Sequence, residues 1–254
     1  LFLHILKMGY VLRGVELSVR RPILNVDFVH YYGITLKGAH FLASGRLWGY
    51  DPFEMAGYPA GIFYAVGSYW ATFISYLMSP WISVPVSLLW IQLVVLVGAP
   101  ALIYMAAKNF GASRLQASVS LLLFVLFYAA IEPFSTYNLI GGLLFYQLAA
   151  MTGIFQLSLV WRWLVSKRIL DWGLLVVTTG LLFHFHSSAL AIVLPGNVLF
   201  WIWKADFRSF RDHGLALLGI FVVGVINWPW IQPFFLFKSW FSNTPYLTFQ
   251  GVSL

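Results

Sequence analysis

The ionisable side chains best suited to chemistry are concentrated in one early stretch, residues 27–70. This stretch holds three of the chain's eight acidic residues and two of its six histidines. Asp27 and His30 are three residues apart, so on a helix they share one face, where the imidazole could orient the carboxylate or bind a metal ion with it. Asp51 and Glu54 follow as a second acidic group that could hold an acceptor hydroxyl or a metal. The pattern predicts a polar site built around carboxylates.

Each of these residues also has a purely structural interpretation. Asp27 is chemically suited to cap a helix that begins at residue 28. His30 could be an ordinary interfacial histidine, since D-x-x-H spacing is common. Asp51 and Glu54 could be solvated turn residues, because the loop between residues 45 and 61 is rich in Gly and Pro.

Composition indicates what kind of protein must position these groups. Of the 254 residues, 61% are hydrophobic and 9% are charged, whereas about 25% of the residues in a soluble domain are charged. Such a chain cannot cover itself with a solvated surface. Its continuous apolar runs predict an all-α fold, a polytopic transmembrane helical bundle. The absence of cysteine excludes disulfides and thiolate metal sites.

The chain divides into four expected parts. Residues 1–26 form an arm or the tail of an earlier helix, residues 27–79 an outer loop with juxtamembrane helices, residues 80–240 the transmembrane bundle, and residues 241–254 an outward C-terminal segment. Within the outer loop, residues 27–44 have the helical spacing of apolar residues that predicts an amphipathic helix at the membrane surface. The expected spans are residues 82–107, 115–131, 139–163, 170–185, 187–203 and 213–235.

Charge alternates along the expected bundle. Lys and Arg gather in three loops, near residues 108–114, 162–168 and 204–211. These loops alternate with loops that contain Glu132, the pair His184 and His186, and Lys238. The excess of basic residues on the cytoplasmic side of membrane proteins predicts that the three basic loops face the cytoplasm. The same explanation accounts for the net charge of +7 without nucleic acid as a partner.

Two features of this topology concern the candidate site. His184 and His186 join two apolar segments shorter than the roughly 20 residues of a full crossing, so we expect their turn inside the membrane profile, facing a cavity. Residues 62–79 determine the side of the early stretch. As a full crossing they would put it in the cytoplasm, and as a surface helix they would put it outside with Glu132. The charge pattern alone leaves both arrangements open.

The order of short motifs in the early stretch is more specific. After Asp27 and His30 the motifs are Gly45-Arg46-Leu47-Trp48, Tyr50-Asp51-Pro52 and Gly57-Tyr58-Pro59, with an aromatic run from Phe63 to Trp70. This order resembles the first outer loop of the GT-C superfamily of integral membrane glycosyltransferases, which includes protein O-mannosyltransferases, aminoarabinose transferases and bacterial relatives. The resemblance extends over most of residues 14–240 as a pattern of spacing. The second acidic residue beside the first Asp is absent here, as is one Pro of the family's "G-x-P…Y-x-P" segment.

The resemblance implies an activity. The chain would move a sugar from a polyprenyl-phosphate donor to a glycan, lipid or protein acceptor at the outer face of a bacterial inner (plasma) membrane. Asp27 would be the catalytic base that takes the acceptor's proton. Residues 62–79 would lie on the outer surface, as the equivalent segment does in the family. The resemblance implies no specific cofactor, and a divalent metal is left open.

Further residues would bind the substrates. His184 and His186 would contact the donor phosphate, Arg46 and Lys238 would neutralise it, and Glu132 would bind sugar hydroxyls. The structural alternatives are hydrogen-bonded core histidines, a lysine that snorkels to the headgroups and an ordinary loop around Glu132.

Two other classes of function compete with a transferase. A non-catalytic subunit could keep the GT-C fold and pack with other membrane subunits, and its histidines could then ligate pigment or haem. A small transporter would need two related halves with broken helices, and the sequence has no such halves. The sequence also lacks Walker and dinucleotide-binding motifs, which disfavours nucleotide-driven chemistry.

Overall fold

The computed structural model describes residues 26–47, 49–51, 58–60, 67–98, 100–130, 144–186 and 188–236. Helices make up most of this part of the chain, as the composition predicts, and one short antiparallel strand pair is the exception. The helices are α3 (Val26–Ala43), α4 (Gly67–Met78), α5 (Val84–Gly98), α6 (Ala101–Asn109), α7 (Arg114–Ala130), α9 (Leu144–Ser166), α10 (Ile169–Phe185), α11 (Ser188–Lys204) and α12 (Phe210–Leu236). The strands are β1 (Gly49–Asp51) and β2 (Tyr58–Ala60).

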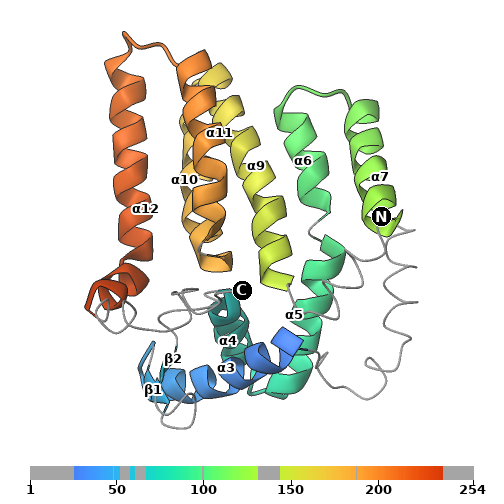
Figure 1. Cartoon of the computed structure of the whole chain (residues 1–254), viewed down its shortest axis with the longest axis vertical. Helices are drawn as coiled ribbons and strands as arrows, with labels where there is room; N and C mark the ends of the chain where they lie inside the picture. Colours follow the sequence, from blue (N-terminus) through green and yellow to red (C-terminus); the bar gives the residue numbers. More distant parts are fainter. Residues whose placement is uncertain are drawn as a thin grey trace, which may run out of the picture.

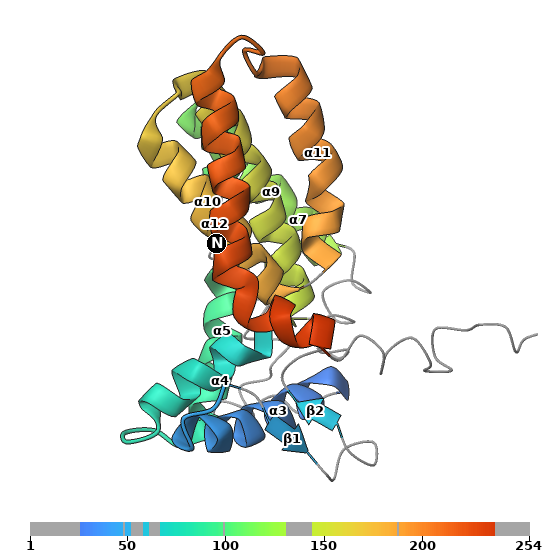
Figure 2. The same ribbon diagram turned by 90° about the vertical axis from the view of Figure 1, so that its left-hand side faces the viewer.

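The helices form an upright set and a layer across one end of it. In Figure 1, α6, α7, α9, α10, α11 and α12 stand with roughly parallel axes, while α3 lies crosswise at their lower end beside β1 and β2. Figure 2 shows the same layer from the side. α4 packs against α3 and α10, and α5 packs against α3, α4 and α9. The helix expected over residues 27–44 is therefore present as α3, and its axis crosses those of the upright helices.

Local signals in the sequence set several helix ends. Gly45 has a φ of 72° and its N–H donates to the carbonyl of Leu42 at 2.9 Å. Such a left-handed glycine is a common C-terminal stop, and it ends α3 as expected. At the start of α7, Ser113 and Gln116 form a capping box. The Ser113 Oγ accepts from the Gln116 N–H at 3.2 Å, and the Gln116 Oε1 accepts from the Ser113 N–H at 2.8 Å.

The prediction of a single helix over residues 82–107 is wrong. This segment is divided into α5 and α6, and Pro100 is the residue that caps α6. Proline has no N–H, and its ring clashes with a carbonyl of the preceding turn, so a continuous helix is interrupted there. The other five expected spans correspond to one helix each, with shifted ends: α7, α9, α10, α11 and α12.

Two described helices contain segments long and apolar enough to cross a membrane, judged by length and composition. They are Leu148–Ser166 in α9 and Phe210–Pro229 in α12. α10 and α11 have 17 residues each, fewer than the roughly 20 of a crossing, as expected. α9 is central, because it packs against α5, α6, α10 and α11. Accordingly, 56% of its apolar segment is buried, compared with 17% of the segment in α12.

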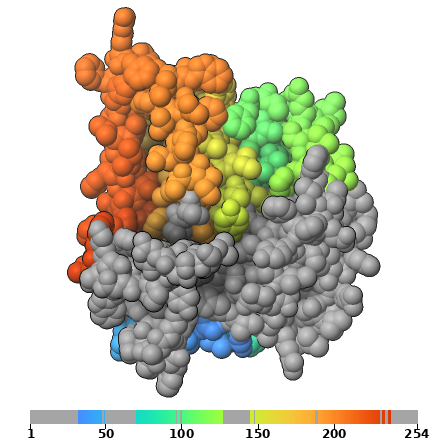
Figure 3. All heavy atoms as spheres, viewed as in Figure 1, coloured from blue at the N-terminus to red at the C-terminus, as the bar shows by residue number. Residues whose placement is uncertain are grey.

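Polar side chains are buried in α9, and large apolar side chains of α12 are exposed. Gln156 and Ser158 of α9 are 1% and 0% exposed, whereas Leu217, Ile220 and Phe221 of α12 are between 67% and 70% exposed. In the space-filling view of Figure 3, α12 forms one edge of the molecule and α6 and α7 form the other. Large exposed apolar surfaces are typical of proteins that contact a membrane or another protein.

Glycines let two pairs of upright helices approach closely. A Cβ added to Gly153 of α9 or Gly196 of α11 would lie within 2.9 Å of a branched side chain on the other helix. α10 and α12 meet in the same way at Gly180 and Gly219, where the nearest atom would lie 3.3 Å or 3.1 Å away. Small residues of this kind are typical of helix contacts inside membranes.

Candidate functional site

The two histidines expected at membrane depth lie where α10 ends and the chain turns into α11. His184 is 3% exposed. Its ring centroid is 5.8 Å from that of Trp70 in α4, with the ring planes inclined by 52°. Trp70 is the last residue of the early aromatic stretch, so this contact joins that stretch to the histidine turn. We call this end of the upright helices the histidine end.

His186 faces a different neighbour. Its backbone is extended, with a φ of −161°, and its ring meets that of Tyr146 in α9 edge to face, with centroids 5.3 Å apart. A cavity of about 280 Å³ between α9 and α11 is lined by Tyr146 together with small residues such as Ala149 and Gly153. The histidine end therefore combines two imidazoles, two aromatic rings and an adjoining apolar space.

Asp27 and His30 lie in the first two turns of α3, the helix that crosses the histidine end (Figure 1). α3 begins at Val26, so Asp27 lies within the first turn and not before it. The cap expected for a helix starting at residue 28 is therefore misplaced, although a carboxylate in a first turn is still favoured by the helix dipole. The side chains of Asp27 and His30 lie outside the described part of the structure.

The remaining predicted site residues are only partly covered. Arg46 is exposed in the turn that follows α3, and its N–H donates to the carbonyl of Phe41 at 2.9 Å. Asp51 ends β1, and its backbone alone is described. The predictions for Glu54, Glu132 and Lys238 fall outside the described residues.

Among the residues that the structure describes, no three His, Asp or Glu side chains come close enough together to hold a metal ion.

The opposite end of the upright helices carries the loops rich in Lys and Arg, and we call it the basic end (Figures 1 and 2). Asp171, in the first turn of α10, is 1% exposed. Its carboxylate lies 2.7 Å from Arg162 Nη2 and accepts from the Ser166 hydroxyl at 2.5 Å. Arg162 also donates to the side chain of Asn109 at 3.1 Å. These bonds connect α9 to both α10 and α6.

A second buried carboxylate repeats the arrangement. Asp212, in the first turn of α12, is 4% exposed and lies 2.5 Å from the Lys167 ammonium. Arg211 donates to the carbonyl of Lys167 at 3.3 Å. Lys167 has a φ of 54°, a left-handed conformation that is uncommon for residues other than glycine. Its two contacts with α12 stabilise that conformation in the turn between α9 and α10.

The sequence interpretation missed this basic-end network. It assigned Arg162 and Lys167 to a cytoplasmic loop and gave Asp171 and Asp212 no role. One signal was available, since each Asp stands in the first turn of an apolar helix just after a run of basic residues. The Lys167–Asp212 pair, however, joins residues 45 positions apart, and only the packing of α10 against α12 brings them together.

The geometry separates two kinds of polar group. At the basic end, buried carboxylates are neutralised by paired cations and tie helices together. At the histidine end, two imidazoles lie against aromatic rings beside the layer that contains α3. Comparisons of the chain with protein-family models, with curated proteins and with solved structures found no match. The histidine end is the candidate functional site.

Proposed function

We propose that the chain is a polytopic membrane protein whose basic end faces the cytoplasm. Three observations support this: the two apolar segments of spanning length, the exposed apolar side chains of α12, and the gathering of Lys and Arg at one end. Basic loops remain preferentially on the cytoplasmic side. α3, which lies crosswise at the other end, would then be a surface helix at the outer face. A bacterial inner membrane is the setting that suits this arrangement.

At that outer face the chain would act as a GT-C-type glycosyltransferase that moves a sugar from a polyprenyl phosphate to a glycan, lipid or protein acceptor. The observation that carries this proposal is the contact between Trp70 and His184, with ring centroids 5.8 Å apart. It brings the helix that follows the carboxylate-rich stretch to the histidine turn. One site can therefore contain both groups, which would be impossible if they lay at opposite ends.

The proposed reaction uses these groups in order. Asp27 takes the proton of the acceptor hydroxyl as the acceptor oxygen bonds to the anomeric carbon, and the bond from that carbon to the phosphate oxygen breaks. The phosphate leaves with its lipid. His186 is less buried than His184, so it is better placed to hydrogen-bond to that phosphate, with Arg46 and Lys238 neutralising its charge. The cavity beside Tyr146 offers apolar space for the lipid. Holding donor and acceptor together supplies much of the acceleration.

The test is the release of polyprenyl phosphate by the purified full chain in nanodiscs. The probes are polyprenyl-phosphate hexoses and pentoses, each offered with a membrane extract as the source of acceptor. Asp27→Asn should lower the release at least about a hundredfold, the usual contribution of a general base. Thermal unfolding should change little, because the amide has nearly the same shape as the carboxylate and only the favourable interaction of its charge with the helix dipole is lost.

Asp206→Asn is the matched control. Asp206 is an exposed carboxylate at the basic end, so its variant should retain full release. Full activity of Asp27→Asn would remove Asp27 from the mechanism. No release by the unmodified chain with any donor, together with a fixed stoichiometry of co-purifying membrane subunits, would favour the non-catalytic subunit.

A further inference from the structure

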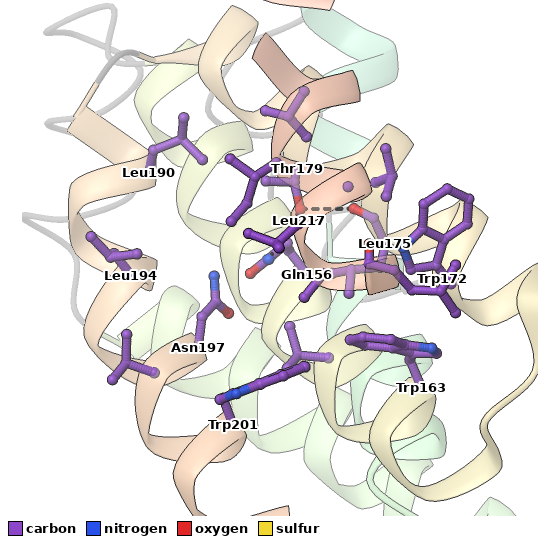
Figure 4. A pocket seen from close by; sticks show the side chains of 18 of the residues that line it. Gln156, Trp163, Trp172, Leu175, Thr179, Leu190, Leu194, Asn197, Trp201 and Leu217 are labelled. Atoms are coloured by element: carbon purple, nitrogen blue, oxygen red, sulfur yellow. Dashed lines mark hydrogen bonds between the residues drawn. The ribbon is translucent and has the colours of Figure 1, made fainter. Parts of the chain in front are cut away.

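A larger cavity lies toward the basic end, between α9, α10, α11 and α12. Its volume is about 740 Å³, within the range of roughly 300–1,000 Å³ that is typical of small-molecule sites. Trp163 and Trp201 stack in its wall with centroids 5.8 Å apart (Figure 4). The lining runs along α12 from His213 to Val223, about 15 Å of helix at 1.5 Å per residue. That depth is about half of the hydrocarbon thickness of a bilayer.

The apolar lining is interrupted by the polar side chains of Gln156, Thr179 and Asn197 (Figure 4). His213 is a fourth, and its Nε2 is hydrogen-bonded to the carbonyl of Phe207 at 3.1 Å. The Gln156 amide nitrogen donates to the Thr179 hydroxyl at 3.1 Å, and that hydroxyl donates to the carbonyl of Leu175 at 2.7 Å. Among the described residues, neither Gln156 Oε1 nor Asn197 Oδ1 has a hydrogen-bond partner, although both atoms are buried. Gln156 is only 1% exposed. Each oxygen exposes less than 1 Å², so a donor in the cavity would reach it after rotation of the side-chain amide. The bond would satisfy an acceptor that is unfavourable to leave unpaired.

The cavity opens sideways. Four of its lining side chains are strongly exposed: Leu194 at 59% and Val198 at 48% on α11, and Leu217 at 68% and Ile220 at 70% on α12. α11 packs mainly against α9 and α10, and α12 packs mainly against α10. The gap between α11 and α12 is therefore the entrance, and it faces the direction in which membrane lipid would lie.

We propose that this cavity binds one uncharged lipid alcohol, an apolar molecule that carries a hydroxyl group. The molecule enters between α11 and α12 and packs its apolar body along the Leu, Val and Trp lining. Its hydroxyl donates to Gln156 Oε1 or to Asn197 Oδ1. A plain hydrocarbon chain would leave both acceptors unsatisfied. A charged headgroup is disfavoured because the described lining contains no Lys, Arg, Asp or Glu, and the ring nitrogen of His213 is already bonded to the carbonyl of Phe207. The site lies toward the basic end, so it does not rest on the proposed glycosyl transfer.

The test is native mass spectrometry of the delipidated full chain in detergent. The probes are 1-hexadecanol and 1-methoxyhexadecane, which has a similar shape but no donor. The alcohol should form a one-to-one adduct and bind about tenfold more tightly than the ether, the effect of one hydrogen bond to a buried group. Equal affinities for the two probes, or no adduct with the alcohol, would overturn the proposal.

Substitutions test which side chains accept the hydrogen bond from the alcohol. Gln156→Leu combined with Asn197→Leu should weaken alcohol binding about tenfold and leave ether binding unchanged. Thr152→Val is the matched control, because it removes a buried hydroxyl from α9 outside the cavity and should change neither affinity. Ala191→Trp fills the cavity and should abolish both adducts. An unchanged alcohol affinity in the Leu pair, or an adduct that survives the filling, contradicts the site. Should the Leu pair fail to fold, the comparison of alcohol and ether on the unmodified chain decides.

Discussion

The two ends of the upright helices accommodate their polar groups in different ways. At the basic end, Asp171 and Asp212 are buried and each is paired with a cation from another element. At the histidine end, His184 and His186 pack against the rings of Trp70 and Tyr146. An ion pair with a buried carboxylate fixes helices in one geometry, because breaking it leaves an uncompensated charge. Ring contacts are weaker, so less free energy is lost when the histidine end exchanges them for other contacts.

The largest effect should follow from breaking an ion pair at the basic end. Arg162→Met leaves the Asp171 carboxylate, which is 1% exposed, without its cation. Loss of one partner of a fully buried pair costs about 3–5 kcal/mol. Arg162 itself is partly exposed, so we expect a loss of about 2–3 kcal/mol in the free energy of unfolding, measured by denaturant titration in detergent. Arg168→Met removes an exposed cation from the turn between α9 and α10 and should cost less than about 0.5 kcal/mol.

The same pair allows a sharper test. Arg162→Met combined with Asp171→Leu removes both charges, and apolar replacement of a whole buried pair is often nearly neutral. The double variant should therefore be more stable than Arg162→Met alone. Equal stability of Arg162→Met and Arg168→Met would mean that the pair does not anchor the basic end.

A smaller and more local effect is expected at the histidine end. Trp70→Ala removes the ring that packs on His184, and such ring pairs contribute about 0.5–1.5 kcal/mol. Hydrogen exchange should accelerate in the amides of α4, while the amides of α9 and α12 exchange as before. Trp70→Phe keeps a ring and should preserve most of the protection. Equal acceleration in α4 and α12 would show that the two ends are not independent.

The smallest effect concerns a cation at the basic end that has rings as neighbours. The Lys204 ammonium lies 4.9 Å from the ring centroid of Trp161 and 4.6 Å from that of Trp203. Exposed contacts of this kind contribute about 0.5–1 kcal/mol, so Lys204→Met should lower the free energy of unfolding by about 0.5 kcal/mol. Arg208→Met, on the exposed turn that follows, is the control. A loss as large as that of Arg162→Met would show that buried carboxylates are not what distinguishes the basic end.

Sequence patterns predicted most of the helices for identifiable reasons. Continuous apolar runs and stop signals such as Gly45 are local, so α3 and α9 to α12 could be read directly, with errors only at their ends. The prediction of one helix over residues 82–107 was wrong because it gave more weight to the continuous apolar run than to the break at Pro100. Burial of the turn at His184 was also predictable, because the two segments that flank it are too short to cross a membrane.

The candidate site was harder to predict because its contacts join distant residues. Trp70 and His184 are well separated in the chain, and only the crosswise layer of α3 and α4 puts them together. For the same reason Lys167 was assigned to a cytoplasmic loop and Asp212 was given no role. A charge count records how many cations a loop has, but not which carboxylate on another helix neutralises them. The roles proposed for Asp27, His30, Asp51, Glu54, Glu132 and Lys238 stay predictions.

The reciprocal glycines of the upright helices have a consequence for the larger cavity. Gly153 and Gly196 let α11 pack closely on α9, and Gly180 and Gly219 let α12 pack closely on α10. The two helices on either side of the entrance, α11 and α12, are therefore each fixed to a different helix at the base of the cavity. Moving α11 toward α12 to close the cavity would break one of these two close helix contacts. The larger cavity is therefore already formed, and binding of a molecule there would require little reorganisation of the helices.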